Sequence, residues 1–252
     1  MLSSALNFDS RPCRESTLKD LNLSLFAAYR VAAVDPEIIA NNHRTMEEQL
    51  ASLRFFDLKY HCPTMAGILL FGNNPRYFLP GAYLQYLKLP GIELTDLPEN
   101  QAEISGDLLS ILRELDTHVR VNIQKTLHPL TALREKVLSD YPERAVRELL
   151  MNAVMHRNYE SNTPARFYWF SDRIEILSPG GLYGEVTPDN YLTRNSYRNP
   201  VIAAAMKLLG YVNQFGYGIQ NAQRLLQQNG NPPATFDFDA RSVLVRIPKR
   251  SE

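Results

Sequence analysis

The spacing of apolar residues divides the first half of the chain into helical and strand-like segments. Apolar positions recur every three or four residues in three predicted helices, residues 16–35, 44–53 and 105–123. Residues 66–71 form a short apolar run, and residues 81–89 alternate apolar and polar side chains as a strand does. The His128-Pro129 pair then interrupts the pattern. We therefore expect a domain boundary between about residues 125 and 138.

The second half of the chain alternates helices and strands more regularly. It begins with a predicted helix over residues 141–159, followed by two strands joined by a tight turn at Ser171-Asp172. After a loop rich in turn residues come two helices and two closing strands, predicted over residues 201–209, 218–228, 235–238 and 243–247. This order predicts an α+β protein in three parts. They are an N-terminal extension over residues 1–15, a smaller α+β region over residues 16–130, and an α/β sandwich over residues 131–252, in which helices cover a mixed sheet.

Composition narrows the range of partners and compartments. The 27 basic and 27 acidic residues cancel, so the protein has no overall field that would draw it to a phosphate backbone or an anionic membrane. No apolar run is long enough to span a membrane, and the N-terminus lacks the order of a signal peptide. The two cysteines are too few for a disulfide framework. We expect a cytoplasmic protein without a membrane partner.

The helix predicted over residues 141–159 carries the main candidate chemistry. Asp140 is placed to cap it, Pro142 fits its first turn, and one of its faces is apolar. Glu148, Asn152 and His156 follow at i, i+4 and i+8, so they stack beside that face. A carboxylate there can deprotonate a water, and a carboxamide oxygen can join the oxygen shell of Mg²⁺. The simpler alternative is that the three side chains are solvated at a helix margin.

The string from Glu148 to Arg157, ELLMNAVMHR, resembles the N box of GHKL (Bergerat) ATPases, which has the form E/N-L-L-x-N-A-x-x-H. The resemblance implies that Asn152 holds Mg²⁺ and that Glu148 is the general base for ATP hydrolysis. His156 and Arg157 would lie beside the nucleotide. Arg157 has an alternative role, an interaction with the carbonyls at the C-terminal end of its helix.

Two glycine turns follow in the order expected of that superfamily. DRIEILSPGGL resembles the strand and turn of the G1 box, where Gly180 and Gly181 would let the nucleotide approach the backbone. Gly216 and Gly218, at the start of a predicted helix, resemble the second glycine box, which is a phosphate-binding turn. Ser178 stands where the G1 box usually has an Asp that accepts a hydrogen bond from adenine. A hydroxyl can accept this bond, although more weakly than a carboxylate.

The loop over residues 183–199 corresponds to the lid that closes over ATP in the superfamily. It contains Arg194 and Arg198, either of which can reach a phosphate or remain solvated. Aromatic residues in the strand patterns, Tyr83, Tyr86, Phe167, Tyr168 and Trp169, are more typical of packing than of base stacking.

Nearly the whole chain resembles RecG-like, helicase-related proteins of the Schlafen-AlbA transcriptional regulator type, through DRIEILSPGGL, SYRNP and QFGYGI. In those proteins an AlbA-type domain precedes the segment that resembles FDSRPCREST, and contact with DNA is expected only through that separate domain. The sequence contains no G-x-x-x-x-G-K-[ST] phosphate loop, so helicase activity is not predicted.

Three functional hypotheses follow. The favoured one is an ATP-binding regulatory protein, a nucleotide-dependent switch with slow or conditional Mg²⁺-ATP hydrolysis. The second is a degenerate Bergerat fold that binds no nucleotide and acts as a scaffold, which predicts a homodimer. The third, a nucleic-acid-binding protein in its own right, is disfavoured by the zero net charge.

Overall fold

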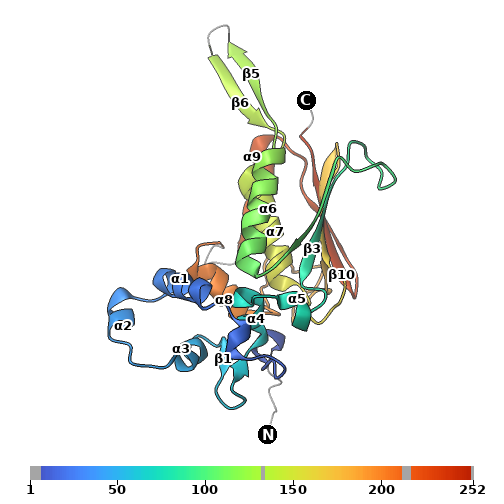
Figure 1. Cartoon of the computed structure of the whole chain (residues 1–252). Coiled ribbons are helices and arrows are strands. Elements are labelled where there is room, and N and C mark those ends of the chain that lie inside the picture. The colour runs from blue at the N-terminus through green and yellow to red at the C-terminus, as the bar shows by residue number, and fades with distance from the viewer. Residues whose placement is uncertain (1–6, 132–133, 212–216, 251–252) are drawn as a thin grey trace.

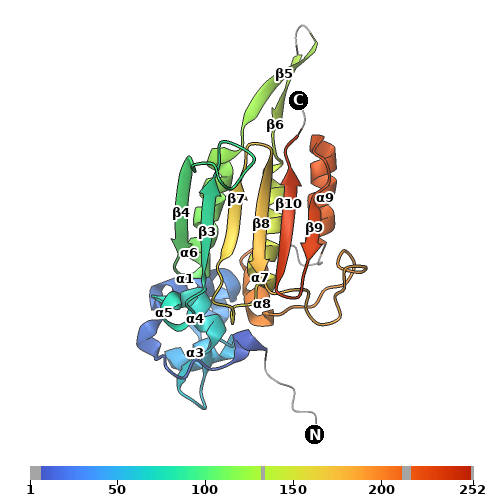
Figure 2. The same ribbon diagram turned by 90° about the vertical axis from the view of Figure 1, so that its right-hand side faces the viewer.

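A six-stranded mixed sheet forms the centre of the protein, as a computed structural model shows (Figures 1 and 2). The structure describes residues 7–131, 134–211 and 217–250. The strand order is β4-β3-β7-β8-β10-β9, in which β3 and β7 are parallel and every other neighbouring pair is antiparallel. The strands are β3 (Tyr83–Lys88), β4 (Asn100–Ser105), β7 (Ala165–Trp169), β8 (Arg173–Pro179), β9 (Thr235–Phe238) and β10 (Ser242–Pro248).

Three long helices cover one face of this sheet: α6 (Leu108–Asn122), α7 (Glu143–His156) and α9 (Gly218–Asn229) (Figures 1 and 2). Burial alternates along β7 and β8, so one set of side chains from each strand enters the core beneath these helices. The same period places Ile174 and Ile176 in the core. The predicted α+β fold, a mixed sheet covered by helices, is confirmed.

Smaller elements gather at one end of the sheet (Figure 1). They include the 3₁₀ turns η1 (Phe8–Ser10) and η2 (Leu18–Asp20), the two-stranded sheet of β1 (Phe56–Asp57) and β2 (Cys62–Pro63), and short helices. These helices are α1 (Leu23–Ala33), α2 (Pro36–Ala40), α3 (Met46–Ser52), α4 (Met65–Phe71), α5 (Pro75–Phe78) and α8 (Pro200–Leu208). The apolar run at residues 66–71 is therefore helical. Its N-terminus is capped by Thr64, whose Oγ1 accepts from the Gly67 amide.

The stretch expected to contain a domain boundary is instead a β-hairpin of β5 (Lys125–Thr131) and β6 (Arg134–Ser139) that projects from the body (Figure 1). Both predicted regions contribute strands to the central sheet, because β3 and β4 precede residue 130 and β7 follows it. The division into regions 16–130 and 131–252 remains a prediction.

Helix α7 begins slightly later than predicted and without the predicted cap. Its N-cap is Pro142, which makes no side-chain capping bond. The Asp140 carboxylate accepts instead from the Gln124 and Tyr141 amides at the base of the hairpin. Asp140 therefore links the start of the hairpin to the residue that precedes α7. The prediction that Asp140 caps the helix was wrong.

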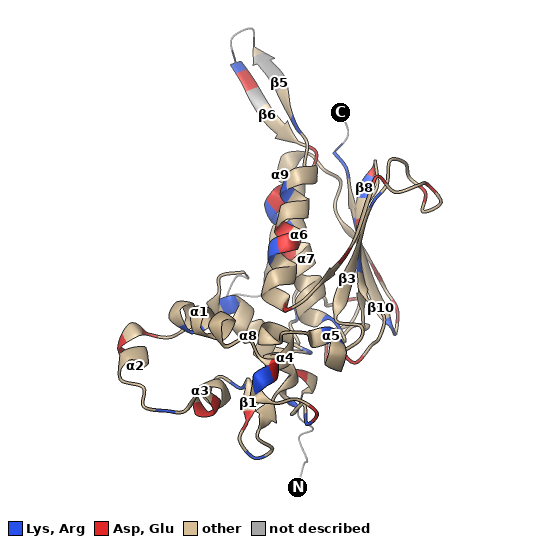
Figure 3. Ribbon diagram, in the orientation of Figure 1, with Lys and Arg blue, Asp and Glu red and all other residues tan. Residues whose placement is uncertain are grey.

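Basic and acidic residues alternate along the outer helices (Figure 3). Arg120 of α6, for example, pairs with Asp116 one turn earlier at 2.9 Å and with Glu143 of α7 at 3.5 Å. Within the described ranges, none of the helices has the length and apolar character that crossing a membrane requires.

Candidate functional site

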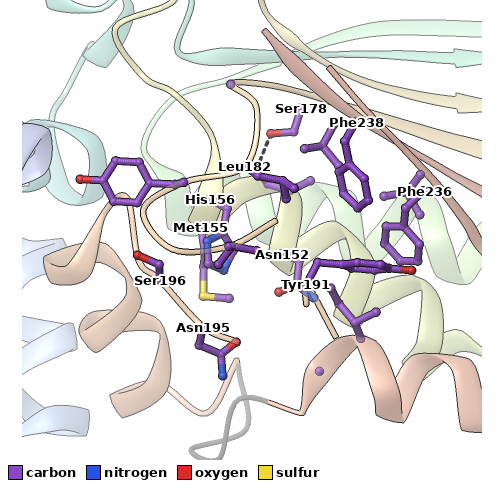
Figure 4. A pocket seen from close by; sticks show the side chains of 18 of the residues that line it. Asn152, Met155, His156, Ser178, Leu182, Tyr191, Asn195, Ser196, Phe236 and Phe238 are labelled. Atoms are coloured by element: carbon purple, nitrogen blue, oxygen red, sulfur yellow. Dashed lines mark hydrogen bonds between the residues drawn. The ribbon is translucent and has the colours of Figure 1, made fainter. Parts of the chain in front are cut away.

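A cavity lies between α7, the strands β8 to β10, the start of α9 and the loop over residues 181–197 (Figure 4). The space between these elements is about 1160 Å³ when the solvent at its open mouth is included. Most of its wall is apolar, from side chains such as Leu149, Ile176 and Val245. Its charged lining side chains are Arg194 and Lys207, and no Asp or Glu is found among the described residues that line it. An anionic ligand with an apolar part fits this wall.

The polar stripe predicted on α7 reaches this cavity in part. Asn152 and His156 line it, whereas Glu148 lies one turn further toward the N-terminus of the helix. The Asn152 amide donates to the Glu148 carbonyl oxygen at 3.0 Å, which leaves the Asn152 side-chain oxygen as an acceptor. The helical register thus brings Asn152 and His156 together at the cavity, as the i, i+4 spacing predicts.

Glu148 meets the start of α9. A Cβ at Gly218 would lie 3.0 Å from Glu148 Oε2 and 3.3 Å from Asn152 Nδ2, so only glycine allows this approach without displacement. Glu148 Oε2 is buried and has no hydrogen-bond partner among the described residues. Burial raises the pKa of the Glu148 carboxyl, and the charges of Arg147 and Arg144 lower it less. A desolvated carboxyl near a ligand cavity is suited to proton transfer.

Gly218 is the first residue of α9, and the helix begins without a side-chain cap. Gly218 and Ile219 line the cavity, so the positive end of the helix dipole lies at its wall. Gly216, the other glycine of this predicted phosphate-binding turn, lies outside the described residues.

Ser178 lies on β8 at the cavity wall and is 6% exposed. Its hydroxyl donates to the Ala153 carbonyl oxygen on α7 at 2.8 Å (Figure 4). Because the only hydroxyl proton is used in this bond, the oxygen can act toward a ligand only as an acceptor. Ser178 therefore offers the same hydrogen-bonding polarity as a carboxylate at this position.

Gly180 and Gly181 form the turn after β8 and line the cavity. A Cβ at Gly180, where φ is +100°, would meet the Asn158 Cβ at 2.7 Å. A Cβ at Gly181 would meet the Asp239 carbonyl oxygen at 2.4 Å. These two positions require glycine because the turn packs closely on neighbouring protein atoms, a reason separate from the predicted approach of a ligand.

His156 stacks on Tyr197 of the loop, with ring centroids 5.5 Å apart and planes at 15°. Burial lowers the pKa of the His156 imidazole to about 4, and the charge of Arg198 acts in the same direction. His156 is therefore neutral at neutral pH. A neutral imidazole can donate or accept a hydrogen bond with a ligand, but it adds no charge to the site.

Arg157 turns away from the cavity. Its guanidinium donates to the carbonyl oxygens of Tyr83 at 3.2 Å, Thr163 at 2.8 Å and Gly81, and the residue is 4% exposed. These bonds join the end of α7 to the start of β3. The structure does not bring Arg157 together with the cavity, and its position indicates a structural role.

The two loop arginines have different surroundings. Arg198 is not part of the lining; it donates to the Gly181 carbonyl oxygen at 2.9 Å and stacks over Tyr183. Arg194 lines the cavity, is 64% exposed at its side chain and forms a loose ion pair with Glu185 at 3.4 Å. Only Arg194 is therefore placed to meet a ligand without giving up a well-formed contact.

Sequence reasoning missed an aromatic cluster at one end of the cavity. Tyr191 of the loop lies against Phe236 and Phe238 of β9, with ring centroids 5.2 and 4.9 Å apart (Figure 4). The aromatic residues singled out in the sequence as packing residues do not line the cavity. The alternation of Phe236 and Phe238 signals a shared face of β9, but no local pattern indicates that Tyr191 meets them.

The residues present are compatible with a magnesium ion that is held mainly by a ligand. The described residues contain no group of three or more His, Cys, Asp or Glu that could hold a metal. Mg²⁺ commonly keeps water and phosphate oxygens as ligands and needs only one or two protein oxygens. The free side-chain oxygen of Asn152 and the unpartnered Oε2 of Glu148 are such donors.

Comparison with known proteins identifies one family that resembles part of the chain. Residues 163–247 match the family described as "Putative ATP-dependent DNA helicase recG C-terminal". This range includes β7 to β10, the loop and α9. No curated protein matches the chain.

A crystal structure of the DIP2311 protein from Corynebacterium diphtheriae, a structural-genomics target, has the same fold, with a TM-score of 0.74 and 22% sequence identity. The similarity covers 99% of this chain and 49% of that one, so this chain spans about half the length of that protein. At this identity the likeness concerns the fold alone. The family match, by contrast, bears out the resemblance predicted from the sequence: residues 163–247 are similar to the ATPase-like C-terminal region of RecG-like proteins.

Proposed function

We propose that the cavity binds an adenine nucleotide with Mg²⁺ and that the protein acts as a nucleotide-dependent regulatory switch with slow or conditional hydrolysis. The observation that carries this proposal is the cavity wall, which combines aromatic and aliphatic side chains with Asn152, Lys207 and the first residues of α9. Apolar side chains suit a base, and a cation and a helix N-terminus each suit phosphates.

Three of the predicted residues have a definite part in this proposal. Ser178 accepts from the amino group of the base, because its proton is already donated to Ala153. The Asn152 oxygen contributes to the Mg²⁺ shell, and the metal, when bound, would neutralise phosphate charge. Glu148 takes a proton from the attacking water, a role that its burial and raised pKa favour.

The first experiment is thermal unfolding of the whole chain with increasing Mg²⁺-ATP or Mg²⁺-ADP. Binding to the folded state raises the melting temperature, with a gain of about 2.7 kcal/mol at a ligand concentration one hundred times Kd. If saturating concentrations of both nucleotides leave the melting curve unchanged, nucleotide binding is ruled out.

Two variants separate binding from hydrolysis. Glu148→Gln keeps the shape of the side chain but removes the base, so we expect hydrolysis to fall by ~10²-fold or more while ATP affinity stays within about threefold. Asn152→Ala removes an Mg²⁺ ligand, so we expect weaker binding with Mg²⁺ and little change with EDTA. Equal loss of binding and turnover in both variants would contradict these roles.

A second candidate is a scaffold that binds no nucleotide. The observation in its favour is that Ser178 is bonded to α7 and that no carboxylate lines the described wall of the cavity. This candidate predicts a homodimer whose mass, measured by light scattering, is the same with and without ATP. A monomer that binds ATP in the melting experiment would exclude it.

A further inference from the structure

Lys207 is a charged residue at the cavity to which the sequence motifs assign no role. It lies near the C-terminal end of α8 and lines the cavity. Its Nζ lies 4.6 Å from the centroid of the Tyr197 ring. No carboxylate pairs with it within the described part of the chain, whereas Arg194 is paired with Glu185. Lys207 is therefore the cavity cation that can bind an anion without first leaving an ion pair.

The surroundings of Lys207 orient it toward the predicted site. The Lys207 ammonium lies over the Tyr197 ring, and the same ring stacks on the His156 imidazole. His156 in turn follows Asn152 by one turn on α7, and both line the cavity. The cation, the aromatic ring and the imidazole thus form a row that ends beside the candidate Mg²⁺ ligand.

The other end of α8 is held by a residue from the start of the chain. Asp9 is fully buried, and its Oδ2 accepts from the amides of Val201 at 2.7 Å and Ile202 at 3.1 Å. The residue at the N-cap position, Asn199, makes no capping bond with its side chain. Asp9 thus caps α8 from 192 positions earlier in the sequence.

The segment around Asp9 is also fixed to its surroundings. Asp9 belongs to η1, and two residues later Arg11 forms an ion pair with Glu160 at 2.7 Å. The Arg11 carbonyl oxygen accepts from Met65, the first residue of α4. Residues 8–13 are therefore bonded both to α8 and to the elements that surround it.

Helix α8 is short and well packed between these two contacts. Val201, Ile202, Ala203, Ala205 and Met206 are all buried, so the helix is expected to move as one body. A displacement of Lys207, near the C-terminal end of α8, is then expected to displace the N-terminal amides that Asp9 caps. Asn199, just before α8, adds a second link, because its amide donates to the carbonyl oxygens of Met155 and Arg157 at the end of α7.

We propose that Lys207 contacts the phosphates of the bound nucleotide, and that α8 couples occupancy of the cavity to residues 8–13 through the Asp9 cap. This inference rests on the proposed function and names the route by which that site is regulated. Coupling of this kind is reciprocal, so the state of Asp9 must also change the affinity for nucleotide.

The first test concerns the phosphate contact and uses isothermal titration of the whole chain. Lys207→Met should weaken ATP binding about tenfold or more, because a charge-assisted contact is lost, and should leave adenosine binding unchanged. Lys207→Arg should retain most of the ATP affinity. The matched control is Lys125→Met, at the start of the projecting hairpin, which should behave as wild type. Equal weakening of ATP and adenosine binding would overturn the contact.

The second test concerns the coupling. Asp9→Ala removes the acceptor and should weaken ATP binding by about fivefold, at the low end of measured couplings, whereas Asp9→Asn keeps an acceptor and should bind as wild type. In the Lys207→Met background, Asp9→Ala should have no further effect on ATP affinity. Independent effects of the two substitutions would overturn the coupling.

Hydrogen exchange on the wild type provides a test that does not depend on the folding of a variant. Saturating Mg²⁺-ATP should slow exchange of the amides of Val201 and Ile202 and of residues 8–13, and should not do so in Lys207→Met at saturation. If the wild type binds ATP and its hydrogen exchange is unchanged, the proposed coupling is wrong and the proposed function stands. A wild type that does not bind ATP would sink both this inference and the proposed function.

Discussion

Ser178 shows how one hydrogen bond can define the selectivity of a site. A free serine hydroxyl can donate to a 6-oxo purine or accept from a 6-amino purine. In this protein the proton is held by the Ala153 carbonyl oxygen at 2.8 Å, so only the acceptor role remains. A 6-amino base is therefore favoured, and a 6-oxo base would place two acceptors against each other.

This polarity predicts that wild-type protein binds ATP about tenfold more tightly than GTP, a difference of roughly 1.4 kcal/mol. Ser178→Ala should bring the two affinities to within about twofold, chiefly by weakening ATP binding. Isothermal titration with both nucleotides measures the ratio. Ser196→Ala, at another serine that lines the cavity, is the control and should preserve it. A wild type that binds both nucleotides equally would refute the acceptor argument.

Arg157 stabilises the fold rather than the cavity. Its guanidinium satisfies three carbonyl oxygens at the junction of α7 and β3. Arg157→Met should lower the free energy of unfolding by about 3 kcal/mol, because buried acceptors lose their donors. Arg157→Lys should recover only part of this loss, since an ammonium cannot reproduce the planar fork. Urea unfolding of both variants measures the effect. Arg44→Met, at an exposed arginine, should stay within about 0.5 kcal/mol of wild type. A similarly small change at Arg157 would contradict the structural role.

At the scale of elements, the loop over residues 181–197 is held in place by few contacts. Tyr191 packs on Phe236 and Phe238, and the Gln220 side chain of α9 donates to the Leu192 carbonyl oxygen at 2.9 Å. Since an aromatic pair contributes about 0.5–1.5 kcal/mol beyond its buried area, the loop should open without Tyr191.

Limited proteolysis tests this expectation, because Arg194 provides an exposed trypsin site within the loop. Tyr191→Ala should raise the rate of cleavage at Arg194 by about fivefold or more, in line with the loss of at least 1 kcal/mol of loop contact. Tyr77→Ala, at an exposed tyrosine of α5, should leave the rate unchanged. If Tyr191→Ala is cleaved at the wild-type rate, the aromatic cluster does not hold the loop.

At the scale of the whole molecule, the sequence was informative where contacts are local. The i, i+4 spacing of Asn152 and His156 placed both at the cavity, because residues four apart share a helix face. The strand alternation likewise predicted β7 to β10. In contrast, the Asp9 cap joins residues 192 positions apart, and the meeting of Tyr191 with β9 depends on the path of a loop. Local patterns carry no signal for such contacts, and for the same reason the fixed carbonyl partners of Arg157 were not foreseen.

Burial of His156 also makes the stability of the whole protein depend on pH. Its pKa in the folded protein is about 4, compared with about 6.5 in an unfolded chain, so the unfolded state binds more protons between these values. This contribution to stability is present above pH 6.5 and is lost as the pH falls toward 4. The lowered pKa of His118 acts in the same direction, whereas the raised pKa values of Asp9 and Asp140 act in the opposite one.

A variant isolates the His156 contribution from these other groups. His156→Gln should reduce the loss of unfolding free energy between pH 7 and pH 4 by at most about 3 kcal/mol, the full value of the shift before solvent screening. Urea unfolding without nucleotide at several pH values gives the two curves. His43→Gln, at an exposed histidine, should follow the wild-type curve. If the curve of His156→Gln is parallel to that of wild type, His156 takes up its proton equally in both states, and the lowered pKa assigned to His156 is wrong.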